Sequence, residues 1–158
     1  MQRKMRLVLT LLVISSFLLP GYASEQDSLK HLLEEAQTDS AKGHILYKLA
    51  DKLYSSKPDS ALNYARQALE KAKSLGVKKL EAKTLATMGN IFDEKGALLQ
   101  SLEYNQQALE IFRNLAMNAR IGLTLNNIGI VYYKLGDYPK AIDMLHRALD
   151  IRKNYTDS

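Results

Sequence analysis

The chain has 158 residues, of which 46% are hydrophobic and 25% charged, a balance typical of one water-soluble domain. It contains no cysteine, which excludes disulfide bonds, thiolate nucleophiles, cysteine-based zinc sites and a lipid-modified N-terminal cysteine. Without Arg3, Lys4 and Arg6 the formal charge falls from +5 to +2, with 19 basic residues against 17 acidic ones. Since these charges alternate in sign along the helices, we expect no nucleic-acid partner.

The first 23 residues have the three regions of a secretory signal peptide. Residues 1–6 are basic, and residues 7–19 are almost wholly apolar. The segment then closes with small residues three apart, which end at Ala23. We therefore predict cleavage after Ala23 and a periplasmic or secreted protein. The alternative is an uncleaved segment that anchors the chain to a membrane, although its apolar run is short against the ~20 residues needed to span a bilayer.

Apolar residues recur at intervals of three and four after this segment, which predicts a succession of amphipathic helices. The first helix, at about 27–37 with Asp27 or Ser28 as its N-cap, has no partner of its own. We expect this helix, within residues 24–40, to cap the start of a stack. The remaining helices are expected at about 41–55, 58–75, 78–95, 97–115, 118–135 and 138–154.

The sequence repeats itself with a period of 40 residues. A shift by one period aligns Gly129 with Gly89, Gly136 with Gly96 and Ala148 with Ala108. A weaker third copy begins at Ala41 and aligns only if its loop, residues 55–60, is one residue shorter. This predicts an all-α fold, an α-solenoid of about three antiparallel helix-turn-helix repeats behind a short capping helix. The repeats are expected at about 41–77, 78–117 and 118–157.

The aligned residues resemble the tetratricopeptide repeat. The third copy has the family's order of large, small and aromatic residues at Leu125, Ile128-Gly129, Tyr132, Ala141, Leu145 and Ala148. The second copy departs from this order at Ser101, where the family favours alanine. The period of 40 exceeds the family's usual ~34 residues. It is similar to the repeats of the extracytoplasmic region of certain bacterial histidine kinases and transcriptional regulators.

No combination of residues in the sequence indicates catalysis. His31, His44 and His146 lie on different predicted helices, and no glycine-rich phosphate loop or histidine-glutamate zinc motif is present. We therefore expect no enzyme activity, no cofactor and no metal site.

The resemblance implies that the first helix of each repeat lines a concave groove for a protein or peptide. Amide side chains can pair with a peptide backbone, and tyrosines can contact its apolar groups. The expected groove residues are Tyr47, Lys83, Asn90, Asn126, Asn127 and Tyr133. The competing interpretation is that these residues only solvate the surface. The family's clamp for a C-terminal carboxylate is not reproduced, because Tyr47 and Asp51 occupy positions where it has lysine and asparagine.

These expectations lead to two hypotheses about function. The first is an exported, non-enzymatic scaffold that mediates protein–protein or protein–peptide interaction through its groove. The alternative is the periplasmic sensor region of a two-component histidine kinase or a transcriptional regulator, acting in signal transduction. No polar helix follows the last repeat, so its outer side is expected to meet a second copy in a homodimer, another partner or a further part of the chain. The opposing view is that three repeats tolerate an exposed edge.

Overall fold

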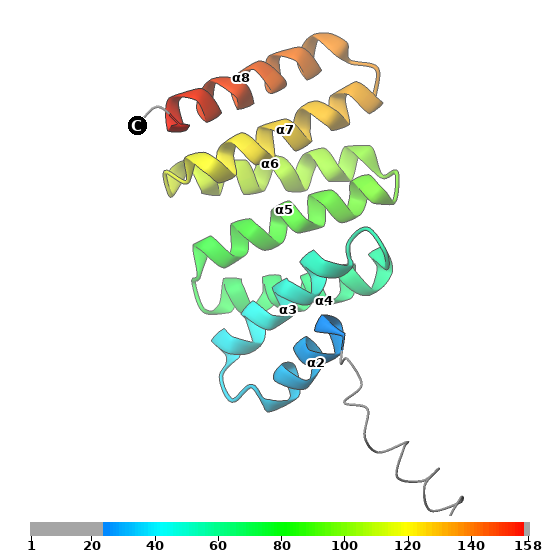
Figure 1. Cartoon of the computed structure of the whole chain (residues 1–158), viewed down its shortest axis with the longest axis vertical. Coiled ribbons are helices and arrows are strands. Elements are labelled where there is room, and N and C mark those ends of the chain that lie inside the picture. The colour runs from blue at the N-terminus through cyan, green and yellow to red at the C-terminus, as the bar shows by residue number, and fades with distance from the viewer. Residues whose placement is uncertain (1–23, 157–158) are drawn as a thin grey trace, which may run out of the picture.

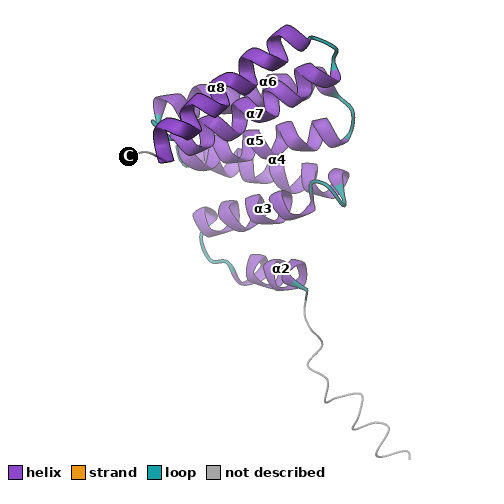
Figure 2. Ribbon diagram, turned by 45° about the horizontal axis from the view of Figure 1, so that its top comes forward, coloured by secondary structure: helices purple, strands orange, loops and turns teal. Residues whose placement is uncertain are grey.

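A computed structural model describes residues 24–156 of the chain, and the regular elements in this range are all α-helices (Figure 2). The helices are α2 (Glu25–Glu35), α3 (Asp39–Leu53), α4 (Pro58–Ser74), α5 (Lys78–Glu94), α6 (Leu98–Asn114), α7 (Asn118–Lys134) and α8 (Tyr138–Thr156). They form one stack of antiparallel pairs that runs from α2 to α8 (Figure 1). The predicted solenoid behind a short capping helix is therefore confirmed, and every helix end lies within two residues of its expected position. The predicted signal peptide lies outside the described residues.

The hydrophobic core is built from clusters that each join one helix pair to the next. One cluster includes Leu53 of α3, Ala65 of α4 and Phe92 of α5. A second includes Leu85 of α5, Phe112 of α6 and Leu125 of α7. Because α5 contributes to both clusters, each pair buries its apolar side on its neighbour, as in other helical solenoids.

Glycines stand where the two helices of a pair approach most closely. A Cβ atom placed on Gly89 would lie 2.3 Å from Nδ2 of Asn105 on α6. A Cβ atom placed on Gly129 would lie 2.9 Å from Cγ of Leu145 on α8. The 40-residue shift aligns these two glycines, so the repeated sequence pattern corresponds to a repeated contact, in which a side chain of the second helix packs on the backbone of the first.

Four helices end in the same hydrogen-bonded turn. Gly76, Gly96 and Gly136 have φ angles of +68°, +72° and +79°. The following N–H reaches back five residues, as from Ala97 to the Phe92 carbonyl oxygen at 2.8 Å. This is the Schellman motif, which favours glycine because a left-handed backbone crowds a Cβ atom. The turn after α6 has the same hydrogen bonds but contains Ala116, with a φ of 50°.

Ala116 therefore carries avoidable backbone strain. We expect Ala116→Gly to raise the free energy of unfolding by about 0.5–1 kcal/mol, because glycine adopts this conformation without a steric penalty. Urea denaturation followed by circular dichroism measures the change. The matched variant Gly96→Ala should lower the free energy of unfolding, and an Ala116→Gly protein no more stable than the original would contradict this interpretation.

Two helix starts differ from the sequence prediction. The N-cap of α2 is Ser24, whose side chain accepts a hydrogen bond from the Asp27 N–H at 3.2 Å, so neither Asp27 nor Ser28 caps this helix. Thr38 caps α3 in the same way through the Ala41 N–H. Each cap lies one residue before its helix. The acidic residues Asp27 and Asp39 fall in the first turns of α2 and α3, where the helix dipole favours a negative charge. Within residues 24–156, none of the helices is both long and apolar enough to cross a bilayer.

Candidate functional site

The first helices of the three pairs, α3, α5 and α7, contact one another along one face of the stack. Between them lies a cavity of about 240 Å³, which we call the groove cavity. Its polar lining residues include Tyr47, Asp51, Lys83, Asn90, Arg120 and Asn127. All three repeats therefore contribute side chains to a single site.

Two basic side chains line the groove cavity without an acidic partner. Lys83 places its Nζ 5.6 Å from the centre of the Tyr47 ring, and Arg120 of α7 lines the same cavity. Within the described residues neither Lys83 nor Arg120 forms an ion pair. Burial lowers the pKa of Lys83, and the positive charges of Arg120 and Lys79 lower it further, while the negative charge of Asp51 partly opposes the shift. A ligand anion would oppose this shift by stabilising the charged lysine.

The acidic residue nearest to these cations is Asp51, which is held by a neighbouring hydroxyl group. Thr87 donates a hydrogen bond to Asp51 Oδ1 at 3.0 Å. Burial raises the pKa of Tyr47, the Asp51 charge raises it further, and Arg120 opposes both effects. Tyr47 therefore keeps its phenolic proton at neutral pH and presents a hydroxyl group and an aromatic ring to the cavity.

An amide pair connects α5 to α7 at the edge of the groove cavity. Asn127 Nδ2 donates to Asn90 Oδ1 at 2.8 Å. No other side-chain hydrogen bond of these two residues occurs in the part of the chain that the structure describes, so Asn90 Nδ2 and Asn127 Oδ1 remain available. One donor beside one acceptor matches the N–H and C=O groups of an extended peptide backbone.

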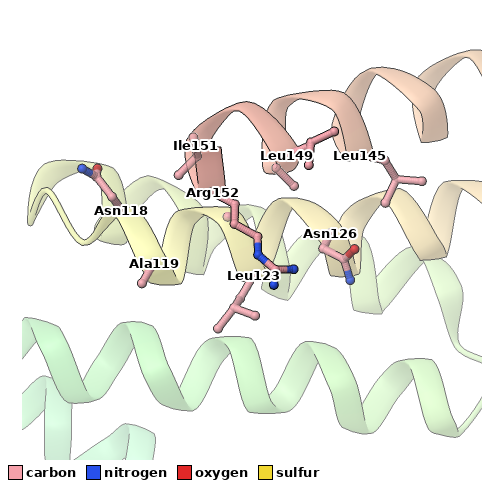
Figure 3. Close-up of a pocket in the computed structure, with 10 residues that line it drawn as sticks. Asn118, Ala119, Leu123, Asn126, Leu145, Leu149, Ile151 and Arg152 are labelled. Atoms are coloured by element: carbon pink, nitrogen blue, oxygen red, sulfur yellow. The ribbon is translucent and has the colours of Figure 1, made fainter. Parts of the chain in front are cut away.

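A larger cavity of about 740 Å³ lies between α7 and α8, and we call it the end cavity (Figure 3). It is mostly apolar, with Leu145 and Leu149 on α8 and Leu123 on α7. Leu123 also lines the groove cavity, so the two cavities adjoin at this side chain. In the preceding repeat, the corresponding valley between α5 and α6 is filled by apolar residues of α7. The end cavity is therefore the open counterpart, in the third repeat, of a valley that the next helix fills in the second.

The structure brings four of the six predicted groove residues to the groove cavity, namely Tyr47, Lys83, Asn90 and Asn127. Asn126 instead lines the end cavity, because it lies one period after Ala86 and so faces the next valley of the stack. Tyr133 lies near the end of α7, is 64% exposed and packs against Tyr138, with ring centres 5.6 Å apart. A binding role for any of the six stays a prediction.

Sequence reasoning missed Arg120. The groove-facing side of α7 passes through Arg120, Leu123 and Asn127, at helical intervals of three and four. The expected face began instead at Asn126. Counting back from Asn127 by the same intervals is the sequence signal that could have found Arg120.

The described residues hold no group of three histidine, aspartate or glutamate side chains close enough to bind a metal ion. The three histidines lie on α2, α3 and α8 and do not line the groove cavity. The chemistry that the groove cavity offers is therefore hydrogen bonding and positive charge.

Comparison with known proteins gives matches to repeat proteins. Residues 80–154 match the family model described as tetratricopeptide repeat. The chain is similar to a Rap protein solved in complex with Competence and Sporulation Factor, with 24% identity and a TM-score of 0.77. It is also similar to the TPR domain of Arabidopsis FLU, with 20% identity and a TM-score of 0.69, and to BtubC (BKLC) from P. vanneervenii, with 28% identity and a TM-score of 0.69.

The extent of these matches differs. The aligned region covers 83% of this chain but 38% of the Rap chain, and 82% of this chain but 53% of BtubC. For FLU the figures are 74% and 99%. The chain thus spans well under two thirds of the Rap and BtubC chains. A search of curated proteins finds no significant match.

Proposed function

Because residues 80–154 match the tetratricopeptide-repeat family model and the fold is that of a helical-repeat solenoid, we propose that this chain is a non-enzymatic scaffold that binds a peptide or an extended protein segment in the groove cavity. One observation carries the proposal: a single cavity with walls from all three repeats is lined by Lys83, Arg120 and the Asn90–Asn127 amide pair. The Rap protein of similar fold was solved in complex with Competence and Sporulation Factor, which supports a binding role for this architecture.

The charge of the cavity favours a ligand with an acidic group. Lys83 and Arg120 lack ion pairs, and their two positive charges exceed the single negative charge of Asp51, the acidic residue that lines the cavity. A carboxylate between the two cations would form charge-assisted hydrogen bonds, each contributing about 1.5–3 kcal/mol. Asn90 and Asn127 would hold the adjoining backbone.

Fluorescent heptapeptide pools test this proposal. One pool has a fixed central glutamate among mixed apolar residues, and the other has glutamine at that position. We expect the chain to bind the glutamate pool at least about tenfold more tightly, as one charge-assisted hydrogen bond provides. The variant Lys83→Met/Arg120→Met should lose this preference, measured by fluorescence anisotropy.

The control variant Lys73→Met/Arg113→Met removes the same charges from exposed positions on α4 and α6. It should keep the preference for glutamate. An equal loss in both variants would mean that net charge, and not the groove cavity, attracts the peptide. Failure of the unaltered chain to bind either pool would contradict the proposal.

The outer face of α8 supports a proposal about assembly. This helix exposes Ile142, Leu145 and Leu149. In the preceding repeat, the apolar side of the equivalent helix, α6, is covered by α7. We propose that a second copy covers it in a homodimer. Light scattering should give twice the chain mass, and a monomer that persists at high protein concentration would contradict the homodimer.

Export is proposed from residues 1–23 alone. N-terminal sequencing of the protein from its own cells should begin at Ser24 if the segment is cleaved, and retention of Met1 would contradict cleavage. The alternative function is the sensor region of a histidine kinase or transcriptional regulator, which rests on the similarity of the 40-residue repeats behind a predicted signal peptide to such proteins. A reading frame that continues beyond the codon for Ser158 into an effector domain would favour the sensor, and a stop codon there would favour the free scaffold.

A further inference from the structure

A pair of polar residues is buried in the second repeat, beside the groove cavity. Ser101 is 0% exposed and Asn105 is 1% exposed, both on α6. One period later the same positions hold Ala141 and Leu145, and Leu145 packs closely on Gly129 as Asn105 packs on Gly89. The chain itself therefore shows that an apolar pair can fill this place in a repeat, so packing alone does not require the polar residues.

One atom of this pair has no hydrogen-bond partner. Asn105 Nδ2 donates to the Ser101 carbonyl oxygen at 3.0 Å. Because a carbonyl oxygen can only accept, the amide nitrogen and not the amide oxygen must face it. The remaining atom, Asn105 Oδ1, is buried and is the single unpaired side-chain polar atom of this kind among the described residues. A buried acceptor without a donor destabilises the fold, so its presence calls for a physical reason.

Ser101 and Asn105 line a cavity of about 140 Å³ between α5, α6 and α7, which we call the polar subsite. Asn90 and Asn127 line both this subsite and the groove cavity, so the two spaces share one wall. Two acidic residues, Asp93 and Glu94, also line the subsite. Both carboxylate oxygens of Asp93 accept hydrogen bonds from Lys134 at 2.8 Å, whereas Glu94 is exposed to solvent. The subsite therefore offers a buried neutral acceptor, Asn105 Oδ1, beside a carboxylate that is already paired and an exposed one.

We propose that the polar subsite receives one neutral, hydrogen-bond-donating side chain of the bound peptide, an amide or a hydroxyl, with Asn105 Oδ1 as its acceptor. This inference rests on the proposed function of the groove cavity. A backbone held by Asn90 and Asn127 presents a neighbouring side chain to the shared wall, and the volume has room for a few heavy atoms. An amide or a hydroxyl is favoured over a charged group, because a charge brought to the buried Asn105 Oδ1 would lose its hydration for a single neutral partner.

The test gives the second repeat the residues of the third, in the variant Ser101→Ala/Asn105→Leu. The probes are the glutamate heptapeptides, with one flanking position at a time fixed as glutamine, asparagine, serine or threonine, or as alanine or leucine. At one of the flanking positions, the unaltered chain should bind peptides with a donor side chain at least about tenfold more tightly than peptides with alanine. Alanine would leave the buried acceptor unpaired, which accounts for the difference. The variant should lose this preference, still bind the alanine peptides and melt at a higher temperature.

The outcomes separate this inference from the function on which it rests. Equal side-chain preferences in both proteins, or a crystal structure with only a fixed water on Asn105 Oδ1, would overturn the subsite. If the unaltered chain binds no peptide, the proposed function fails, and acetamide then probes the subsite alone. A change in the NMR signal of the Asn105 side-chain amide on acetamide addition would support the subsite, and no change would overturn it. Should the double variant not fold, Asn105→Ala, which has its counterpart in Ala65, replaces it.

Discussion

Replacing Phe112 with alanine is expected to lower the free energy of unfolding by about 3–5 kcal/mol. Phe112 is 0% exposed on α6 and belongs to the cluster that joins α5, α6 and α7. Removing its ring leaves a cavity between the second and third repeats. The surrounding helices cannot close this cavity without breaking their other contacts. Such a loss is a large fraction of the roughly 5–15 kcal/mol that stabilises an ordinary domain.

Phe112 also lines the groove cavity, so this variant should bind the glutamate peptides more weakly as well. Urea denaturation measures the stability and fluorescence anisotropy the binding. Leu99→Ala is the control, because Leu99 lies on the same helix but is 74% exposed, and its effect should stay within about 0.5 kcal/mol. Similar losses in the two variants would mean that the core cluster does not hold the repeats together.

Gly89→Ala is expected to lower the free energy of unfolding by about 1–3 kcal/mol. The sign is informative, since alanine in a helix interior normally stabilises by about 0.5–1 kcal/mol relative to glycine. Here the new Cβ atom would lie 2.3 Å from Nδ2 and 2.6 Å from Cγ of Asn105, which is buried and cannot swing away. The two helices of the second repeat must then move apart.

Gly122→Ala is the matched control on α7, because its Cβ atom would meet no neighbour closer than 3.6 Å. This variant should be as stable as the unaltered chain or slightly more stable. In the Gly89→Ala background, Asn105→Ala should recover part of the loss, since it removes the clashing amide. A Gly89→Ala protein that gains stability would show that the helices of a pair do not touch at this glycine.

The repeated fold could be predicted from the sequence because the close packing of the two helices in a pair places the same small residue at the same position in successive repeats. Gly89 and Gly129 are aligned by the 40-residue period, and both meet a side chain of the second helix. The turn at Gly136 followed in the same way from its alignment with Gly96. The caps Ser24 and Thr38 were missed, because several adjacent polar residues could begin each helix and only the backbone geometry selects one.

The candidate site could be predicted only in part. Lys83 and Asn90 were found because they flank a clear apolar stripe on α5, whereas Arg120 was missed and Asn126 was assigned to the wrong valley. A one-dimensional period does not describe how each helix is rotated relative to the next, and this rotation decides which face of α7 closes the groove cavity. The unpaired oxygen of Asn105 also depends on three-dimensional contacts that no sequence pattern encodes.

Nitrogen-15 NMR spectra of the chain, recorded with and without the tightest-binding glutamate heptapeptide, test the central claim most directly. The claim is that the face formed by α3, α5 and α7 holds the ligand. The expected result is that the largest signal changes fall on Lys83, Asn90, Arg120 and Asn127, with the exposed sides of α4 and α6 unchanged. Signal changes confined to α4 and α6 would contradict it.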